Sequence, residues 1–255
     1  MKMIAGSGTG ALIISLLVLH GCVTETTGGL PEPAADDTRV QAHLDLARGY
    51  MESGQMDRAR GPLDRALKID PRSAESHVLY ALIYTSEGED SLAEQHFELA
   101  LSYDRANSQA LNNYGSYLYA KGRYEEAAEK LRLLVNDTGY RARAQAFENL
   151  GMAELALGNT EAARVAFNRS LQLSFEQPRA SLELAEIAFA EGDVSAARQY
   201  YDGFRTQARQ TPRTLCLGMK LAQAQVDTDQ LASYALALQN LFPNSPEARE
   251  CEVEK

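Results

Sequence analysis

One spacing pattern returns along most of this chain every 34 residues. It consists of a large residue, a small residue, a glycine, a second small residue and a second large residue. Its first copy is Leu46, Ala47, Gly54, Ala59 and Leu63, and its second is Tyr80, Ala81, Gly88, Ala93 and Phe97. The spacing predicts two amphipathic helices around a turn, and neither helix can bury its apolar stripe alone. Neighbouring copies must therefore stack, which predicts an all-α protein.

A period of 34 residues with this order of large and small positions is similar to the tetratricopeptide repeat (TPR). The resemblance predicts a TPR superhelix of about six helical hairpins over residues 39–255. The expected repeats are 40–73, 74–107, 108–141, 144–177, 178–211 and a degenerate sixth at 212–244. The step from the third repeat to the fourth is longer, and its extra residues lie near 136–140.

The first residues have the features of an export signal. Lys2 precedes an apolar run at 11–19 that is short for a membrane span. The run ends in Leu-His-Gly-Cys, with the cysteine at position 22, which resembles a bacterial lipobox. This predicts a lipoprotein signal peptide at 1–21 and acyl chains on Cys22 that anchor the protein to a membrane. The alternative is an ordinary secretory signal that ends near a cysteine.

Residues 22–38 are rich in Pro, Gly, Thr and acidic residues, which predicts a disordered tether between the lipid and the repeats. The whole chain is acidic, with 35 Asp and Glu against 25 Lys and Arg. No basic stripe with interleaved aromatic residues occurs, so a nucleic-acid partner is not expected.

The sequence offers little for catalysis. The histidines are scattered and form no HExxH zinc motif, and there is no G-x-S-x-G motif of a nucleophile elbow. We therefore expect a protein that is not an enzyme and that needs no cofactor or metal.

With Cys22 assigned to lipid, two cysteines remain. The end of a second helix lies beside the start of a first helix in an antiparallel hairpin, which brings Cys251 near Cys216. An exported compartment permits a disulfide between them. Two separately packed thiols are the alternative.

The first helices of a TPR array line its concave face. The groove positions of the early repeats are Leu44, Met51, Val78, Leu82 and Tyr119. Further groove positions are Asn112, Met152, Leu155, Leu182 and Phe189. Most are apolar, which predicts a site for an apolar strip of an extended or helical partner segment. The alternative is that these side chains pack against neighbouring first helices.

Three stretches resemble a narrower family than the TPR at large. They are Leu111-Asn-Asn-Tyr-Gly115, Phe147-Glu-Asn-Leu-Gly151 and Ala197-Arg-Gln-Tyr-Tyr-Asp202. Together with the lipobox, the acidic tether and six repeats, they resemble the PilF/PilW family of type IV pilus biogenesis lipoproteins.

This resemblance implies a monomeric pilotin on the periplasmic face of the outer membrane. Such a lipoprotein binds the type IV pilus secretin subunit, which is PilQ-like, and promotes its outer-membrane localisation and multimerisation. Cys22 matches the lipid site, and Leu44, Met51, Val78 and Leu82 match the groove region for the secretin. The alternative function is a general periplasmic TPR scaffold for cell-envelope or outer-membrane protein assembly.

Overall fold

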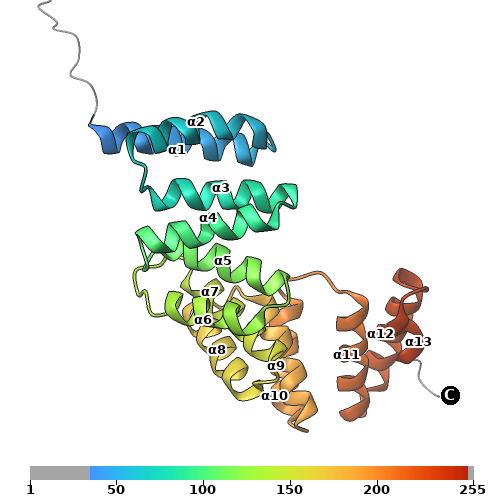
Figure 1. Cartoon of the computed structure of the whole chain (residues 1–255). Coiled ribbons are helices and arrows are strands. Elements are labelled where there is room, and N and C mark those ends of the chain that lie inside the picture. Colours follow the sequence, from blue (N-terminus) through green and yellow to red (C-terminus); the bar gives the residue numbers. More distant parts are fainter. Residues whose placement is uncertain (1–34, 252–255) are drawn as a thin grey trace, which may run out of the picture. The chain divides into compact units, whose positions relative to one another are not determined.

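The computed structural model describes residues 35–251, and its regular elements are thirteen α-helices without a strand (Figure 1). Twelve of the helices form six hairpins, and the short α13 (Pro246–Glu250) follows them. The hairpins are α1 (Asp36–Glu52) with α2 (Met56–Ile69), α3 (Ala74–Glu87) with α4 (Asp90–Tyr103), α5 (Ser108–Ala120) with α6 (Tyr124–Leu134), α7 (Arg143–Ala156) with α8 (Thr160–Leu173), α9 (Pro178–Ala190) with α10 (Val194–Arg205), and α11 (Pro212–Ala224) with α12 (Thr228–Leu241). The prediction of an all-α fold is confirmed.

The helices begin close to the expected positions, with one difference at the start. The expected signal peptide at 1–21 and most of the expected tether lie outside the described residues. Helix α1 begins at Asp36, inside the stretch 22–38 that the composition assigned to the tether. Asp36 and Asp37 lie in the first turn, where negative charge is favoured by the helix dipole.

A left-handed residue makes the turn inside each hairpin. In the first five hairpins this residue is a glycine, such as Gly88 with φ 77°. Glycine is favoured there because it has no Cβ atom to clash in this conformation. In the sixth hairpin the equivalent residue is Val226, which has φ 59° and is 84% exposed. The degenerate repeat thus keeps the turn geometry with a residue unsuited to it.

The small residues of the first helices let the second helices come close. A Cβ atom placed on Gly151 would lie 2.5 Å from Cε1 of Phe167, and one on Gly115 would lie 2.9 Å from Cγ of Leu131. Phe167 and Leu131 are fully buried by this approach. Burial of a side chain of this size contributes about 2–3 kcal/mol to folding.

The hairpins stack in chain order through two kinds of contact. Each second helix from α2 to α10 packs on the first helix of the next hairpin, and the first helices pack on one another from α1 to α11. The first helices therefore form one continuous row, which we call the first-helix row. The connection at residues 135–142 is held by Asp137, whose carboxylate accepts hydrogen bonds from the Ser108 hydroxyl at 2.5 Å and the Gly139 amide at 2.9 Å.

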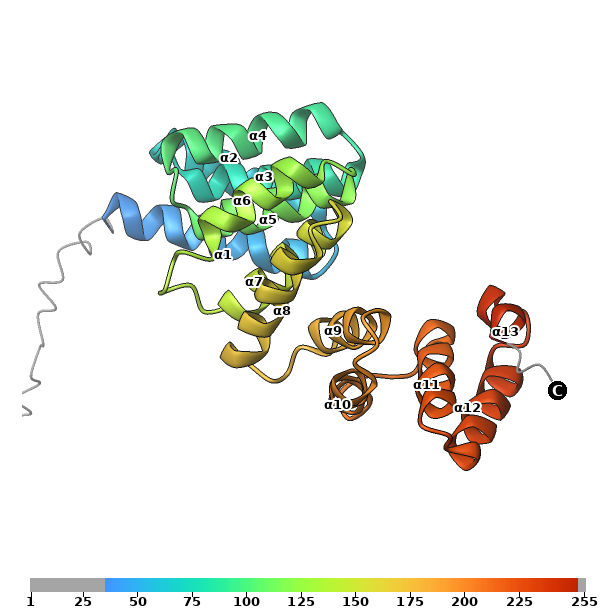
Figure 2. The same ribbon diagram turned by 90° about the horizontal axis from the view of Figure 1, so that it is seen from below.

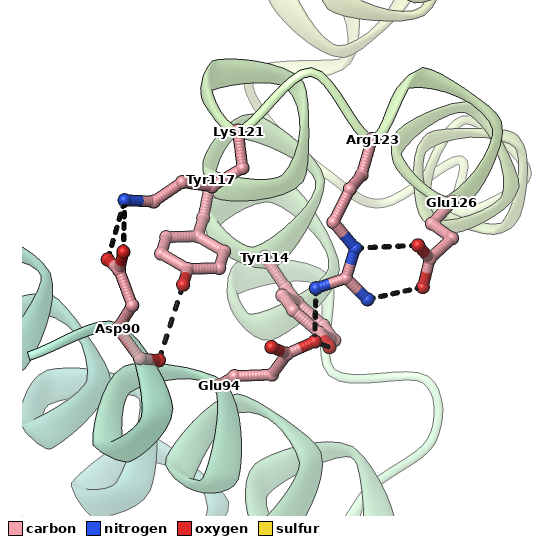
Figure 3. A network of polar contacts seen from close by, with 7 residues as sticks. All are labelled: Asp90, Glu94, Tyr114, Tyr117, Lys121, Arg123 and Glu126. Carbon is pink, nitrogen blue, oxygen red and sulfur yellow. Dashed lines mark hydrogen bonds and ion pairs between the residues drawn. The ribbon is translucent and has the colours of Figure 1, made fainter.

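Polar side chains join the second hairpin to the third (Figure 3). The Tyr114 hydroxyl donates to Oε1 of Glu94 at 3.0 Å, and Arg123 pairs with the same carboxylate at 2.5 Å. Lys121 pairs with Asp90 at 2.6 Å. Burial and the neighbouring Glu94 raise the pKa of Tyr114 above its usual value, which keeps its hydroxyl protonated as a donor. The contact between hairpins is thus apolar at its centre and hydrogen-bonded at its edge.

Candidate interaction site on the first helices

Three pockets lie along the C-terminal part of the first-helix row, whose helices can be followed in Figure 2. Pocket A, of about 160 Å³, is lined by Ser116, Tyr119, Leu131, Asn149, Met152 and Arg179. Pocket B, of about 500 Å³, is lined by Leu155, Thr160, Glu183, Glu186, Ile187, Ala190 and Glu191. Pocket C, of about 320 Å³, is lined by Glu186, Phe189, Arg213, Cys216, Leu217, Lys220, Glu247 and Glu250. Pockets A, B and C follow one another from α5 to α13.

Two of the predicted groove residues are not accessible to a partner. Leu44 is 2% exposed and Val78 is 0% exposed, and both belong to apolar clusters inside the array. The prediction that Leu44 and Val78 line an open surface is therefore corrected. Their side chains are enclosed because neighbouring helices cover that side of α1 and α3. Leu182, a further groove position, is buried as well.

The other three groove residues remain partly exposed. Met51 and Leu82 rest on the apolar cluster of the first two hairpins. Tyr119 lines pocket A, where its ring packs on that of Tyr124 with centroids 5.3 Å apart. Met152 also lines pocket A. Contact of these side chains with a partner remains a prediction.

The structure adds polar groups that spacing did not single out. The Arg179 side chain lines pocket A and forms no ion pair within residues 35–251. In pocket C, Arg213 donates to both oxygens of the buried Glu183 at 3.0 and 2.9 Å, and to Glu186 at 2.5 Å. These bonds raise the pKa of Arg213 and fix both carboxylates in place. No signal in one sequence separates Arg179 from other surface arginines.

A second buried carboxylate supports the row between pockets A and B. Glu148 is 5% exposed, and its Oε2 atom accepts a hydrogen bond from the Ala180 amide at 3.0 Å. Gln145 donates to Oε1 of the same residue at 2.9 Å. Glu148 thus satisfies an amide at the start of α9, where negative charge is favoured. Its role is to hold α7 and α9 together.

The side chains that line pockets A, B and C are of the kinds found at protein-binding surfaces. No cluster of three or more potential metal ligands occurs within the part of the chain that the structure describes. Among helices α1 to α13, none is long and apolar enough to cross a membrane. Pockets A, B and C offer apolar surface beside charged side chains, which suits a side chain or segment of another protein.

The structure describes two of the three cysteines. Cys216 and Cys251 are paired, with Cα atoms 5.7 Å apart, which lies within the range that a disulfide spans. This pairing joins α13 to α11. The predicted lipid site Cys22 lies outside the described residues.

Comparisons with known proteins agree with this architecture. A family model described as tetratricopeptide repeat matches residues 44–108, 92–147 and 148–212. The chain is 40% identical over 247 residues to the type IV pilus assembly protein PilF of Pseudomonas aeruginosa, covering 96% of this chain and 98% of that one.

Two solved structures extend the comparison. A structure from the functional characterization of Pseudomonas aeruginosa PilF has a TM-score of 0.80 at 40% identity and covers 84% of this chain and 97% of its own. The crystal structure of PilW, described as a widely conserved type IV pilus biogenesis factor, has a TM-score of 0.69 at 26% identity. It covers 83% of this chain and 97% of its own.

Proposed function

We propose that this chain acts as a pilotin. The premise is that it belongs to the tetratricopeptide-repeat family and to the PilF/PilW family of type IV pilus biogenesis proteins. Its place in type IV pilus biogenesis follows from that membership. The finer proposal is an outer-membrane lipoprotein that binds the secretin subunit of the pilus machinery and promotes its localisation and multimerisation. The relationship to PilF along almost the whole chain is the observation that carries this proposal.

The proposed mechanism is binding and transport without a chemical step. Acyl chains on Cys22 anchor the protein to the membrane, and the residues before α1 give the repeat array its reach. Several acyl chains are needed, because one chain binds a membrane only marginally. The array then holds a secretin subunit, which exposes apolar surface before it inserts.

Pockets A and B are the proposed contacts for that subunit. Both combine apolar side chains with charged ones, and both lie on the face that TPR arrays present to extended segments. Met51 and Leu82 lie farther along the same row, and we assign them to a weaker extension of the contact. Pocket A also holds Arg179, which favours an acidic group beside the apolar side chain that enters.

The experiment compares secretin multimers in outer-membrane fractions from cells with the intact gene, a deletion, and the Cys22→Ala variant. We expect multimers to be lost on deletion and to be reduced or misplaced with Cys22→Ala. Normal multimers in all three strains would overturn the pilotin proposal. The general periplasmic scaffold would then be the better assignment, since it shares the anchor and the repeats but not the dependence of the secretin.

A further inference from the structure

The residues that begin α13 match those that begin the first helix α11. Helix α11 begins with the N-cap Thr211 followed by a proline, and 34 residues later α13 begins with the N-cap Ser245 followed by Pro246. In both helices the N-cap side chain accepts a hydrogen bond from the backbone amide three residues on. Ala248 is 8% exposed and matches the buried Thr214 of α11. Helix α13 therefore lies in the register of a seventh first helix.

Helix α13 also occupies the place of a first helix. It packs on α11, just as α11 packs on α9 and α3 packs on α1. The pairing of Cys251 with Cys216 fixes it there. At its C-terminal end α13 stops at Glu250 after five residues. It covers the start of the surface that a full first helix would cover.

Helix α12 also presents apolar side chains to solvent. Leu236 is 59% exposed and Leu241 is 67% exposed. The residue 34 positions before Leu236 is Asp202, which is exposed and pairs with Arg198 at 3.0 Å. Every second helix from α2 to α10 is covered in part by the next first helix. The exposed leucines of α12 lie on a helix without such a full-length neighbour in the described chain.

Helix α1 presents the complementary half of the same contact. Leu46 is 43% exposed, whereas its equivalents Tyr80 and Tyr114 are buried. Those two tyrosines pack on the preceding second helix: the Tyr80 hydroxyl donates to Asp64 on α2, and the Tyr114 hydroxyl donates to Glu94 on α4. Within residues 35–251 no second helix precedes α1. The face around Leu46 is thus built to pack on a second helix.

We propose that the Leu46 face of α1 fits the α12 face of a second copy of this chain, and that α13, held by the Cys216–Cys251 pair, prevents the two faces from docking. A docked α1 would continue the stack as the next first helix, so it would pack on α11 as well as on α12. Helix α13 already occupies that part of α11. The contact is head-to-tail, so each added copy would leave the same faces open at its ends. The pinned α13 keeps the chain monomeric.

The test measures the mass in solution of residues Asp36–Lys255, which form one compact unit. Sedimentation equilibrium is recorded over a range of concentrations for the parent and for the double variant Cys216→Ser, Cys251→Ser. A chain truncated after Asn244, which lacks α13, gives a second route to the same open surface. We expect one chain for the parent, and about a twofold or larger rise in mass with concentration for both variants.

A third substitution identifies the docking face. Adding Leu46→Glu to either variant should restore one chain, because it places a charge in an apolar contact. Val165→Glu is the matched control, since Val165 is 66% exposed on α8, away from both faces, and should change nothing. The proposal is overturned if both α13 variants stay monomeric or if Leu46→Glu leaves the association intact. Loss of helix content beyond the five residues of α13 in both variants would also overturn it, since α13 would then be part of the core and not a removable block.

Discussion

The Nδ1 atoms of His77 and His96 lie 3.0 Å apart, joining α3 to α4 inside the second hairpin. A hydrogen bond at this distance requires that one imidazole donates and the other accepts, so at least one ring is neutral at Nδ1. The two rings lie among Tyr80, Tyr84 and Tyr103. Burial, followed by the charge of His77 and of Arg60, lowers the pKa of His96 to about 4. Burial also lowers the pKa of His77, against the opposing effects of the Pro71 carbonyl and Asp70.

This pair should make stability depend on pH in the mildly acidic range. The unfolded chain binds a proton at each histidine near pH 6.5, whereas folded His96 does so only near pH 4. Between these values the unfolded state holds more protons, so the free energy of unfolding falls as pH falls. With allowance for the partial exposure of His96, we expect a loss of about 1–2 kcal/mol between pH 7 and pH 4.5. Urea unfolding at several pH values measures it.

The control for this prediction is a histidine outside the pair. His96→Gln should flatten the pH dependence, whereas His43→Gln on α1 should leave it unchanged. Equal slopes in the parent and in His96→Gln would show that other groups, such as the carboxylates, cause the loss.

The close approach of α7 and α8 predicts that one methyl group added at Gly151 destabilises the protein. Gly151→Ala would bring a Cβ atom to 2.5 Å from the Phe167 ring, so the helices must move apart at a cost of about 1–3 kcal/mol. Gly49→Ala on α1 is the matched control, because nothing lies within 4 Å of its added atom. That change should stabilise the chain by about 0.5–1 kcal/mol. Thermal unfolding of both variants, followed by circular dichroism, should show shifts of opposite sign.

The turn at Val226 predicts a stabilising substitution. A β-branched residue in the left-handed conformation is strained, and Val226 is too exposed to gain much from packing. Val226→Gly should raise the free energy of unfolding by about 1 kcal/mol. The same substitution at Val165, inside α8, should lower it by about 0.5 kcal/mol. If Val226→Gly destabilised the protein by a similar amount, the strain at this turn would be refuted.

The pairing of Cys216 with Cys251 predicts the thiol content of the folded protein purified under oxidising conditions. Peptide mapping without reduction should find the two cysteines in one linked fragment, and thiol labelling before reduction should modify neither. Labelling of both at full yield in folded protein would mean two separately packed thiols. Material from the reducing cytoplasm serves as the comparison, because both residues should be labelled there once the chain is unfolded.

Pocket A predicts where partner binding is most sensitive. Met152→Glu puts a charge among Tyr119 and Leu131 and should weaken the proposed binding of the secretin subunit about tenfold or more. Val165→Glu on α8 is the control and should have no effect. Helix content measured by circular dichroism must be the same in both variants. Unchanged binding by Met152→Glu would exclude pocket A and direct attention to Met51 and Leu82.

The helical hairpins could be predicted from sequence because glycine and alanine return at the positions where helices touch. Gly151 and Gly88 illustrate this, since one allows close packing and the other allows a left-handed turn. The groove could be predicted only in part. The periodicity placed Leu44 on the same row as Met51, but it could not tell which neighbouring side chains would enclose it.

Charged residues were the hardest to predict. Glu148 and Glu183 are hydrophilic in sequence and look like solvent-exposed positions. They are buried because each meets a donor from another hairpin, namely the Ala180 amide and Arg213. Such pairings join residues about one repeat apart, so composition and local spacing do not predict them.

The tyrosine rings at the contacts between hairpins can serve as intrinsic spectroscopic probes. The chain has 12 tyrosines and no tryptophan, so no indole signal masks tyrosine emission. Tyr80 and Tyr114 report on different contacts, since their hydroxyls bond to α2 and α4 respectively. Replacing one of them by phenylalanine would assign its share of the ultraviolet signal. Stepwise separation of the hairpins could then be followed without any attached dye.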